Sequence, residues 1–313
     1  MTNVKELIDG VAADVNDIMA KDFTFTHTSD VPQVDDSNLT YESGQNKRGE
    51  EINTCVLFVD IRNSVALNSE SKTKTMGRIY TAFTKSVISS ADKCGGQVRN
   101  IIGDRVMVVF PETDCYKNAV ECAITINHIA QKIINEKLSG HDFACGIGID
   151  FGQMRCIKVG TIKRGTANQD YKNLVWIGRP ANMASRLCDN ANKEVQMFKV
   201  VHTVLRPNFT GLLATPPSLL SGNYGMVQKT DMLTAEQFTE LITKDGLNRI
   251  VSISKDGNPV KRSPILVSDR VFNGYRNACP SDNSVKKGWW KEDTKHIRNV
   301  DFKVYGSDLH WVI

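Results

Sequence analysis

The sequence lacks any long apolar segment and carries little net charge. No uninterrupted apolar run approaches the ~20 residues that a membrane-spanning helix needs, and the first residues do not follow a signal-peptide pattern. We therefore expect a cytoplasmic protein with no membrane contact. The formal net charge of +4 over 313 residues is also too small to indicate a nucleic-acid binder, which would gather basic side chains on one face.

The spacing of cysteine and histidine argues against zinc sites and disulfide frameworks. The eight cysteines are scattered without a Cys-x-x-Cys pair, and the six histidines do not show zinc-ligand spacing. Several cysteines lie inside apolar runs, where a free thiol behaves as a small hydrophobic side chain. We expect reduced thiols and no zinc chemistry.

The first fifty residues combine one periodic segment with one polar segment. Between residues 3 and 20, apolar side chains recur at three- and four-residue spacing. This pattern predicts an amphipathic helix that docks on the domain or on a partner chain. Residues 24–50 are polar and contain Pro32 and Gly44, which predicts a linker or an extended arm.

Residues 51–205 alternate between short apolar runs, which predict buried strands, and amphipathic segments, which predict helices. The order predicts an α+β fold with helices over a mainly antiparallel sheet. The expected elements are a strand (51–60), a helix ending at Cys94, a hairpin (97–110), a helix (115–137), a strand (144–150), a long hairpin or flap (151–172), a strand (173–178), a helix after Pro180 and a strand (195–204).

The chain divides by pattern into three regions. An N-terminal helix and arm (1–50) precede a main domain (51–205), and a C-terminal extension (206–313) follows. The extension shows a helical pattern at 234–244 and an alternating segment at 302–313. We expect it to pack on the main domain and to close its sheet.

Two aspartates stand where predicted strands end. Asp60 closes the apolar run that begins at Cys55, and Asp104 follows Gly103 in the predicted hairpin turn. Each aspartate alone is typical of a turn. If the hairpin pairs beside the first strand, both carboxylates lie at one edge of the sheet. Such a pair can hold two divalent cations, and the Ile61 carbonyl adds an oxygen ligand of the kind that Mg²⁺ and Mn²⁺ prefer.

An asparagine and an arginine lie on the helix predicted after Pro180. Asn182 and Arg186 are four residues apart and therefore share a helix face. On its own this is an ordinary exposed polar pair. Beside the two carboxylates, however, such a pair can supply donors for a sugar oxygen and for charge that develops on a phosphoryl group.

Three motifs resemble the signature of the class III nucleotidyl cyclases. They are Phe58-Val-Asp60-Ile, the pair Gly95-Gly96 followed by Ile102-Gly103-Asp104-Arg-Val-Met, and Gly178-x-x-x-Asn182-Met-Ala-Ser-Arg186-Leu. They occur in the family's order and with compatible spacing, over roughly residues 52–205. The resemblance implies the class III cyclase fold, with a ferredoxin-like core.

The resemblance also implies a homodimer whose active sites are built across the subunit interface. One subunit would supply Asp60, Asp104 and the Ile61 carbonyl, which would hold two divalent cations (Mn²⁺ or Mg²⁺) and the triphosphate. The other subunit would supply Asn182 to orient the ribose and Arg186 to stabilise the transition state. The products would be a 3′,5′-cyclic mononucleotide and pyrophosphate.

Two further nucleotide contacts follow from the resemblance. The family usually has a phosphate-binding lysine near its last strand, and Lys303 is the candidate in this sequence. Phe58, in the first motif, is a candidate for contact with the nucleotide.

The two positions through which purine cyclases of this class read the base differ here. The position four residues before the second metal aspartate is typically Lys or Glu, and here it is Asn100. The position three residues before Gly178 is typically Asp or Thr for adenine, and here it is Val175, which cannot form a side-chain hydrogen bond. Asn can donate and accept at once, so Asn100 could pair with uracil or cytosine. Arg99 is a neighbouring candidate, although strand alternation turns it to the other face.

This pattern is similar to the pyrimidine cyclases of bacterial antiphage (Pycsar) systems. That resemblance implies cyclic UMP or cyclic CMP as a messenger for a separate effector, with UTP favoured over CTP. Two other interpretations stay open. One is an adenylate cyclase with atypical base contacts. The other is a non-catalytic nucleotide-binding relative, which would be expected to lose some of the four catalytic side chains that this sequence retains.

Overall fold

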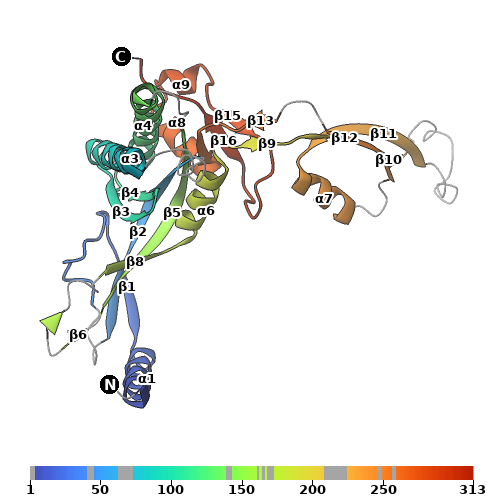
Figure 1. The fold of residues 1–313 in the computed structure, drawn as a ribbon. Helices are drawn as coiled ribbons and strands as arrows, with labels where there is room; N and C mark the ends of the chain where they lie inside the picture. Colours follow the sequence, from blue (N-terminus) through green and yellow to red (C-terminus); the bar gives the residue numbers. More distant parts are fainter. Residues whose placement is uncertain are drawn as a thin grey trace.

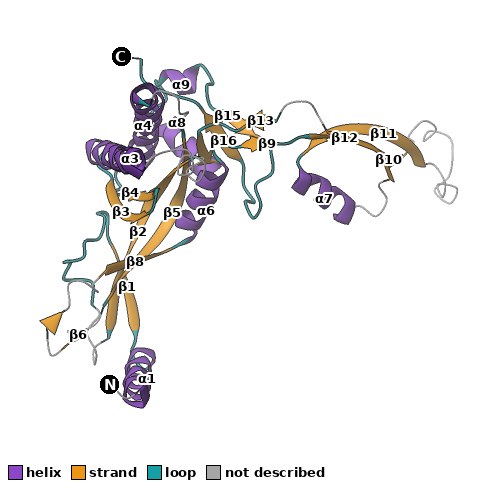
Figure 2. Cartoon of the chain, viewed as in Figure 1, coloured by secondary structure: helices purple, strands orange, loops and turns teal. Residues whose placement is uncertain are grey.

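The structure is a computed structural model. It describes residues 4–40, 46–62, 73–138, 143–160, 162–163, 166–167, 173–207, 224–244, 249–255 and 259–312. Strands form the central layer of the main body, and helices lie on both of its faces (Figure 2). Within the described residues, no helix has the length and apolar character needed to cross a membrane.

Among the described residues, nine strands form one mixed sheet that is mainly antiparallel. Its order is β15-β16-β14-β5-β2-β4-β3, with β1 beside β2 and β8 beside β5. Only the β1–β2 and β14–β5 pairs are parallel. The strands are β1 (Phe23–His27), β2 (Lys47–Ile61), β3 (Gln97–Ile102), β4 (Arg105–Val109), β5 (Cys145–Val159), β8 (Asn173–Ile177), β14 (Ile265–Ser268), β15 (Lys291–Asp293) and β16 (Val304–Ser307).

The two longest strands, β2 and β5, form the centre of the sheet. Each has 15 residues, and their antiparallel register runs from Glu50 opposite Cys156 to Ile61 opposite Cys145. Alternate β2 residues face opposite sides of the sheet because side chains alternate along a strand. Leu57 and Val59 belong to one hydrophobic cluster and Val56 to another, so β2 is buried on both faces.

Helices cover both faces of this sheet (Figure 1). The helices α3 (Thr73–Lys93), α4 (Cys115–His128) and α8 (Asp269–Ala278) bury apolar side chains in the larger cluster. α4 continues through a π-helix (Ile129–Ile134) into α5 (Asn135–Lys137). The opposite face is covered by α6 (Arg179–Asn190), which contributes Ala184 and Leu187 to two smaller clusters.

A second, three-stranded sheet projects from the main body on the right of Figure 1. It consists of β10 (Phe198–Pro207) between β11 (Tyr224–Leu233) and β12 (Arg249–Lys255), with α7 (Ala235–Lys244) beside it. The remaining elements are α1 (Val4–Met19), β6 (Ile162–Lys163), β7 (Thr166–Ala167), β9 (Glu194–Val195), β13 (Val260–Lys261) and α9 (Asn283–Lys286).

The predicted α+β fold is confirmed, and so are the amphipathic N-terminal helix and the hairpin of β3 and β4. Gly103 occupies the hairpin turn with a φ of 61°, a conformation that favours glycine. All eight cysteines are free thiols, and six of them are buried. The division into three regions stays a prediction.

The structure adds detail in three places. The segment 24–50, expected as a linker or an extended arm, contains most of β1 and the start of β2, which pair in parallel. The polar side chains of these strands hid their strand pattern. The long hairpin expected at 151–172 is present in its described parts: β5 runs on to Val159 and pairs antiparallel with β8, and β6 pairs with β7 between them. The sequence pattern also missed β14, a strand of four residues that pairs in parallel with β5.

A buried carboxylate on β5 gives a pH-dependent prediction. Asp150 is 1% exposed, and its Oδ1 has no hydrogen-bond partner among the described residues. Burial raises the pKa of Asp150 above its ordinary value, although a hydrogen bond with Ser268 opposes the shift. The folded protein therefore binds this proton more tightly than the unfolded chain does. The free energy of unfolding consequently falls as the pH rises above the ordinary value of 3.8.

We expect Asp150→Asn to raise the free energy of unfolding at neutral pH by about 1 kcal/mol, because it removes a buried charge with an unsatisfied oxygen. Urea denaturation at several pH values measures the effect, and the gain should disappear as the pH falls below 3.8. Asp35→Asn, at an exposed position, should show no comparable gain. A gain that is the same at all pH values would contradict this explanation.

Candidate active site

The candidate site begins where β2 and β4 end side by side. Their antiparallel register pairs Phe58 with Met107 and Val59 with Val106. Continued by two residues, this register sets Asp60 opposite Arg105 and Ile61 opposite Asp104. The predicted carboxylates therefore stand at neighbouring positions of adjacent strands, at the same edge of the sheet.

Two arginines contact the Asp60 carboxylate. Its Oδ2 accepts a hydrogen bond from Arg105 Nη2 at 3.0 Å and lies 3.5 Å from Arg62 Nη1. The Asp60 side chain is only 15% exposed, so these contacts occur in a partly desolvated setting where attraction between charges is strong. Burial lowers the pKa of Arg105, but its hydrogen bonds to Asp60 and Asp189 outweigh this and raise the pKa above its ordinary value.

Arg105 also joins the sheet to α6. Its Nη1 donates to the Ser185 hydroxyl at 3.1 Å, and its Nη2 donates to the Asp189 carboxylate. One guanidinium thus contacts a carboxylate on β2 and two side chains on the helix that carries Asn182 and Arg186. The arginine thereby links the two halves of the predicted catalytic set.

Arg62 makes a second, more deeply buried link to α6. Its side chain is 9% exposed. Nε donates to the Ala191 carbonyl at 2.8 Å, and Nη2 donates to the Cys188 carbonyl. These carbonyls belong to the C-terminal end of α6, where a helix leaves carbonyl groups unsatisfied. Arg62 therefore fixes the end of the helix against the end of β2.

The other predicted carboxylate has a different setting. Asp104 is half-buried in the β3–β4 turn. Among the described residues, no hydrogen bond or ion pair engages its side chain. Asp60, Asp104 and the Ile61 carbonyl together offer hard oxygen donors, so the chemistry of this donor set fits Mg²⁺ or Mn²⁺. A cation at Asp60 would have to compete with the guanidinium of Arg105.

Asn182 and Arg186 lie on α6, with Asn182 exposed and Arg186 half-buried. In the described parts of the chain, no hydrogen bond or ion pair joins either side chain to Asp60 or Asp104. Arg186 lines a pocket of about 490 Å³ together with Lys193 and other polar residues. Direct contacts within one chain therefore do not bring together the four predicted catalytic side chains.

The base-reading candidates lie on β2, β3 and β8. Asn100 is exposed and forms a cross-strand row with Met107 and the half-buried Phe58. Val175 on β8 is 40% exposed, opposite Ile157 on β5. The two base-reading positions thus carry an amide (Asn100) and an apolar side chain (Val175), and both side chains are accessible to solvent.

Arg99 is the neighbouring candidate on β3. The β3–β4 register shifts between Val98 and Asn100, so Arg99 lies in a bulge. Burial lowers the pKa of Arg99, which lies within electrostatic range of Cys156. Cys156 pairs with Trp176, the neighbour of Val175. The fold therefore brings the Arg99 position near β8.

Two buried N–H groups near these positions have no partner. Arg99 Nε and Trp176 Nε1 are both buried without a hydrogen-bond partner among the described residues. A buried donor without an acceptor costs free energy, which makes each group a candidate for contact with a ligand. Nothing in the sequence pattern singled out Trp176, because an indole on an alternating strand is an ordinary core residue.

Lys303 lies in a different environment. Its side chain is 64% exposed and forms an ion pair with Glu292 at 3.2 Å, and the hydrogen bond with Glu292 raises the pKa of Lys303. It lines a pocket of about 330 Å³ whose lining also includes Glu240, Asp293 and Asp301. The lining thus combines these carboxylates with the cations Lys295 and Lys303. The phosphate-binding role of Lys303 stays a prediction.

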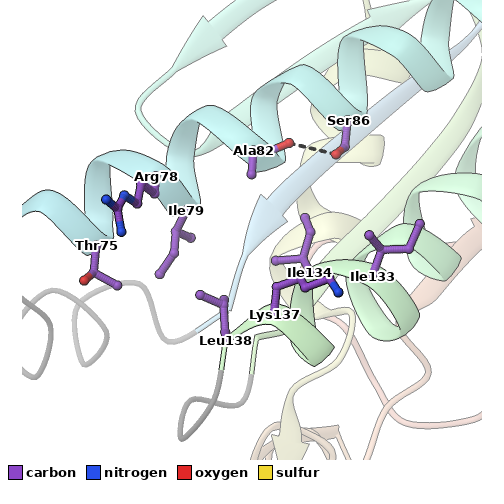
Figure 3. Close-up of a pocket in the computed structure, with 9 residues that line it drawn as sticks. All are labelled: Thr75, Arg78, Ile79, Ala82, Ser86, Ile133, Ile134, Lys137 and Leu138. Carbon is purple, nitrogen blue, oxygen red and sulfur yellow. Dashed lines mark hydrogen bonds between the residues drawn. The ribbon is translucent and has the colours of Figure 1, made fainter.

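Another groove of about 540 Å³ lies between α3 and the π-helix (Figure 3). Ile79 and Ile134 line it from its two sides, and Ser86 at its edge donates a hydrogen bond to the Ala82 carbonyl at 2.7 Å. No residue of the predicted site lines this groove, so it is separate from the candidate active site.

Comparison with known proteins identifies the family. Residues 47–223 match the family model described as the adenylate and guanylate cyclase catalytic domain, which is more than half of the chain. The chain belongs to the class III cyclases. It is therefore a nucleotidyl cyclase, a lyase whose relatives bind a nucleoside triphosphate, generally use two divalent metal ions and typically act as dimers.

Individual relatives of this cyclase are distant. It is 30% identical to a uridylate cyclase of Burkholderia cepacia over 183 residues, which cover 57% of this chain and 75% of that protein. It is 27% identical to a uridylate cyclase of Gulbenkiania mobilis over 194 residues, covering 58% and 70% of the two chains. A crystal structure of the adenylyl cyclase CyaB from P. aeruginosa matches with a TM-score of 0.46 and 14% identity, over 82% of this chain and 94% of the other.

Sequence reasoning about this cyclase missed the arginines around Asp60. Arg62 and Arg105 each stand next to a predicted metal-site residue, Ile61 and Asp104. Their proximity along the chain was visible, but an arginine after a strand is usually exposed. The packing of α6 shows that Arg62 reaches the backbone of this helix and that Arg105 reaches its side chains.

The contact between Arg105 and Asp60 predicts a change in metal affinity. We expect Arg105→Ala to bind Mn²⁺ more tightly than the native chain, with a dissociation constant lower by about tenfold, because a competing cation leaves the Asp60 carboxylate. Calorimetry or Mn²⁺ electron paramagnetic resonance, without nucleotide, measures this constant.

Arg155→Ala is the matched control. It removes the same charge from an arginine that pairs with Glu51 at 3.3 Å and lies over the Phe25 ring. Its Mn²⁺ affinity should stay close to that of the native chain. An unchanged or weaker affinity in Arg105→Ala, in protein shown to be folded by its thermal transition, would contradict the competition.

Proposed function

We propose that this cyclase converts UTP to 3′,5′-cyclic UMP and pyrophosphate, with CTP as its next-best substrate. The observation that carries the proposal is the pair of base-reading positions. Val175 cannot hydrogen-bond an adenine, and Asn100 can both donate and accept. Relatives in Burkholderia cepacia and Gulbenkiania mobilis that are named uridylate cyclases support the same substrate class.

The unpartnered donors beside these positions support UTP over CTP. Arg99 Nε and Trp176 Nε1 are N–H groups that can only donate. Both bases present two acceptors and one donor: uracil has two carbonyls that flank its N3–H, and cytosine has one carbonyl and the ring N3 beside its amino group. Donors placed at both carbonyl positions of uracil would favour uracil, because the cytosine amino group at one of these positions would face a donor of the same kind. Asn100 can supply the acceptor for the uracil N3–H.

The catalytic side chains take the roles that their chemistry allows. Asp60, Asp104 and the Ile61 carbonyl would hold two divalent cations. When bound, such cations lower the pKa of the ribose 3′-hydroxyl and neutralise charge on the leaving pyrophosphate. Asn182 would hydrogen-bond the ribose and hold it in position for attack on the α-phosphorus. Arg186 would donate hydrogen bonds to the phosphoryl oxygens as their charge develops.

The placement of these groups supports a site shared by two subunits. Asn182 and Arg186 make no described contact with the two aspartates of their own chain, and Asn182 is exposed. In a dimer, α6 of one subunit would face the aspartates of the other. The pocket beside Arg186 also contains the cations Lys193 and Arg298. These two cations are further candidates for contact with the pyrophosphate.

The product would be a messenger and not a metabolic intermediate. A cyclic pyrimidine nucleotide carries information only where a separate effector binds it, as the resemblance to antiphage pyrimidine cyclases implies. We therefore propose that the cyclase signals to such an effector in defence against phage.

Incubation with each of the four ribonucleoside triphosphates and Mn²⁺, followed by mass identification of the product, tests the proposal. We expect cyclic UMP to dominate, with cyclic CMP second. Asp60→Ala is the control for catalysis by this site and should give no product, because it removes a predicted metal ligand. Dominant cyclic AMP would refute the pyrimidine assignment and favour the adenylate cyclase alternative. Absence of any cyclic product would favour a non-catalytic relative.

A single substitution tests the role of the Trp176 indole. Trp176→Phe keeps an aromatic ring in the core and removes only the N–H group. We expect kcat/KM for UTP to fall by about tenfold and kcat/KM for CTP to change less, because one hydrogen bond to a base is worth about 1–2 kcal/mol. Steady-state kinetics with the two substrates measures the difference.

Trp290→Phe serves as the comparison. That indole is also buried, but its Nε1 donates to the Ser284 hydroxyl at 3.1 Å, outside the candidate site. It should lower stability without changing the ratio between the two substrates. An equal loss for UTP and CTP in Trp176→Phe would show that the indole serves packing alone.

A further inference from the structure

The N-terminal helix α1 exposes an apolar face that none of the described residues covers. None of its 16 residues is buried. It stands at the end of the molecule beyond β1, away from α3, α4 and the second sheet (Figure 1). Seven large apolar side chains are each at least half exposed, from 50% to 80%: Val4, Leu7, Ile8, Val11, Val15, Ile18 and Met19.

Such a helix needs a partner. In water, an isolated helix of this length is marginal even with a favourable sequence, and α1 contains Gly10 in its middle and several β-branched residues. Each of these lowers its intrinsic helix propensity. Packing of the apolar face would supply the missing stability, and a monomeric soluble protein rarely leaves such a stripe uncovered.

The spacing of the apolar residues indicates what kind of partner fits. Val4, Ile8, Val11, Val15 and Ile18 follow one another at intervals of four, three, four and three residues. This is the heptad spacing in which two helices interlock along a narrow seam. Ile8 and Val15 occupy the seam positions at which β-branched side chains favour a pair of parallel helices.

The charges of α1 favour another protein helix over a membrane. The helix carries Glu6, Asp9, Asp14 and Asp17 against a single basic residue, Lys5. An anionic lipid surface would repel this acidic helix. Glu6, Asp9 and Asp17 lie outside the seam and its flanking positions, so they would stay in water when two helices pair.

We propose that α1 pairs in parallel with α1 of a second copy of this chain. The proposal rests on the dimer that class III cyclases typically form, which would deliver a second α1 at high effective concentration. α1 leads after three residues into β1, whose parallel pairing with β2 connects the helix to the strand that carries Asp60. Pairing of the two helices would therefore hold together the strands that bear the two sets of metal-site residues.

Disulfide cross-linking of the full-length chain tests this interface. Single variants Val4→Cys, Val11→Cys and Ile18→Cys place a thiol along the seam, where the two copies of each residue face each other in a parallel pair. Under mild oxidation, we expect each to form a covalent dimer about tenfold faster than the control, because seam positions bring the two Cβ atoms within disulfide reach. Ala13→Cys, an exposed position on the opposite side of α1, is the control.

The parent chain, with its eight native cysteines, gives the background rate. Cross-linking at Val11 without cross-linking at Val4 and Ile18 would overturn the parallel arrangement, because only the centre of an antiparallel pair brings equal residues together. Equal rates at Ala13 and at the seam would overturn pairing altogether. The reaction is run without nucleotide, so its outcome is independent of whether the protein makes cyclic UMP.

A second variant measures the contribution of the seam. Ile8→Asp/Val15→Asp should raise the dimer dissociation constant by about tenfold or more, because two charges enter an apolar contact. Analytical ultracentrifugation measures this constant, and Ala12→Asp/Ala13→Asp, on the flank and the outer side of the helix, should change it less. Equal constants for the two double variants would overturn the proposal.

Discussion

The arrangement of the candidate site depends on the close approach of α6 to the backbone of β5. At Gly148, an added Cβ would lie 2.2 Å from the Ala184 carbonyl oxygen and 2.2 Å from the Cys188 amide nitrogen. No side chain larger than hydrogen fits between the helix and the strand. Because the helix lies directly on the sheet, its polar side chains are held next to the ends of β2 and β4.

Two arginines add charged contacts to this close approach of α6 and β5. Two residues earlier on β5, at Gly146, an added Cβ would overlap the Arg62 guanidinium, which binds carbonyls at the end of α6 and also approaches Asp60. Arg105 supplies a second bridge between Asp60 and Asp189. A buried carboxylate needs such counter-charges. The same carboxylate is the one expected to bind a metal ion, so the contacts that stabilise the fold also compete with the ligand.

The sequence predicted the parts of this arrangement that have local signals. Apolar periodicity located β2, α3 and α4, and the Gly103-Asp104 turn located the hairpin. The roles of Asn100 and Val175 came from family resemblance and not from periodicity. What could not be predicted depends on contacts between distant segments. β14 is defined by pairing with β5, and the buried guanidinium of Arg62 is defined by carbonyls more than a hundred residues away.

Two independent features of this chain point to a second subunit. The predicted catalytic side chains of α6 make no described contact with the aspartates of their own chain, which agrees with the proposal that another copy completes the site. The apolar seam of α1 likewise has no cover among the described parts of the chain. α1 leads into β1, β1 pairs with β2, and β2 ends at Asp60. A dimer held at both ends of β2 would fix the separation between Asp60 of one subunit and α6 of the other, which is the distance on which the proposed reaction depends.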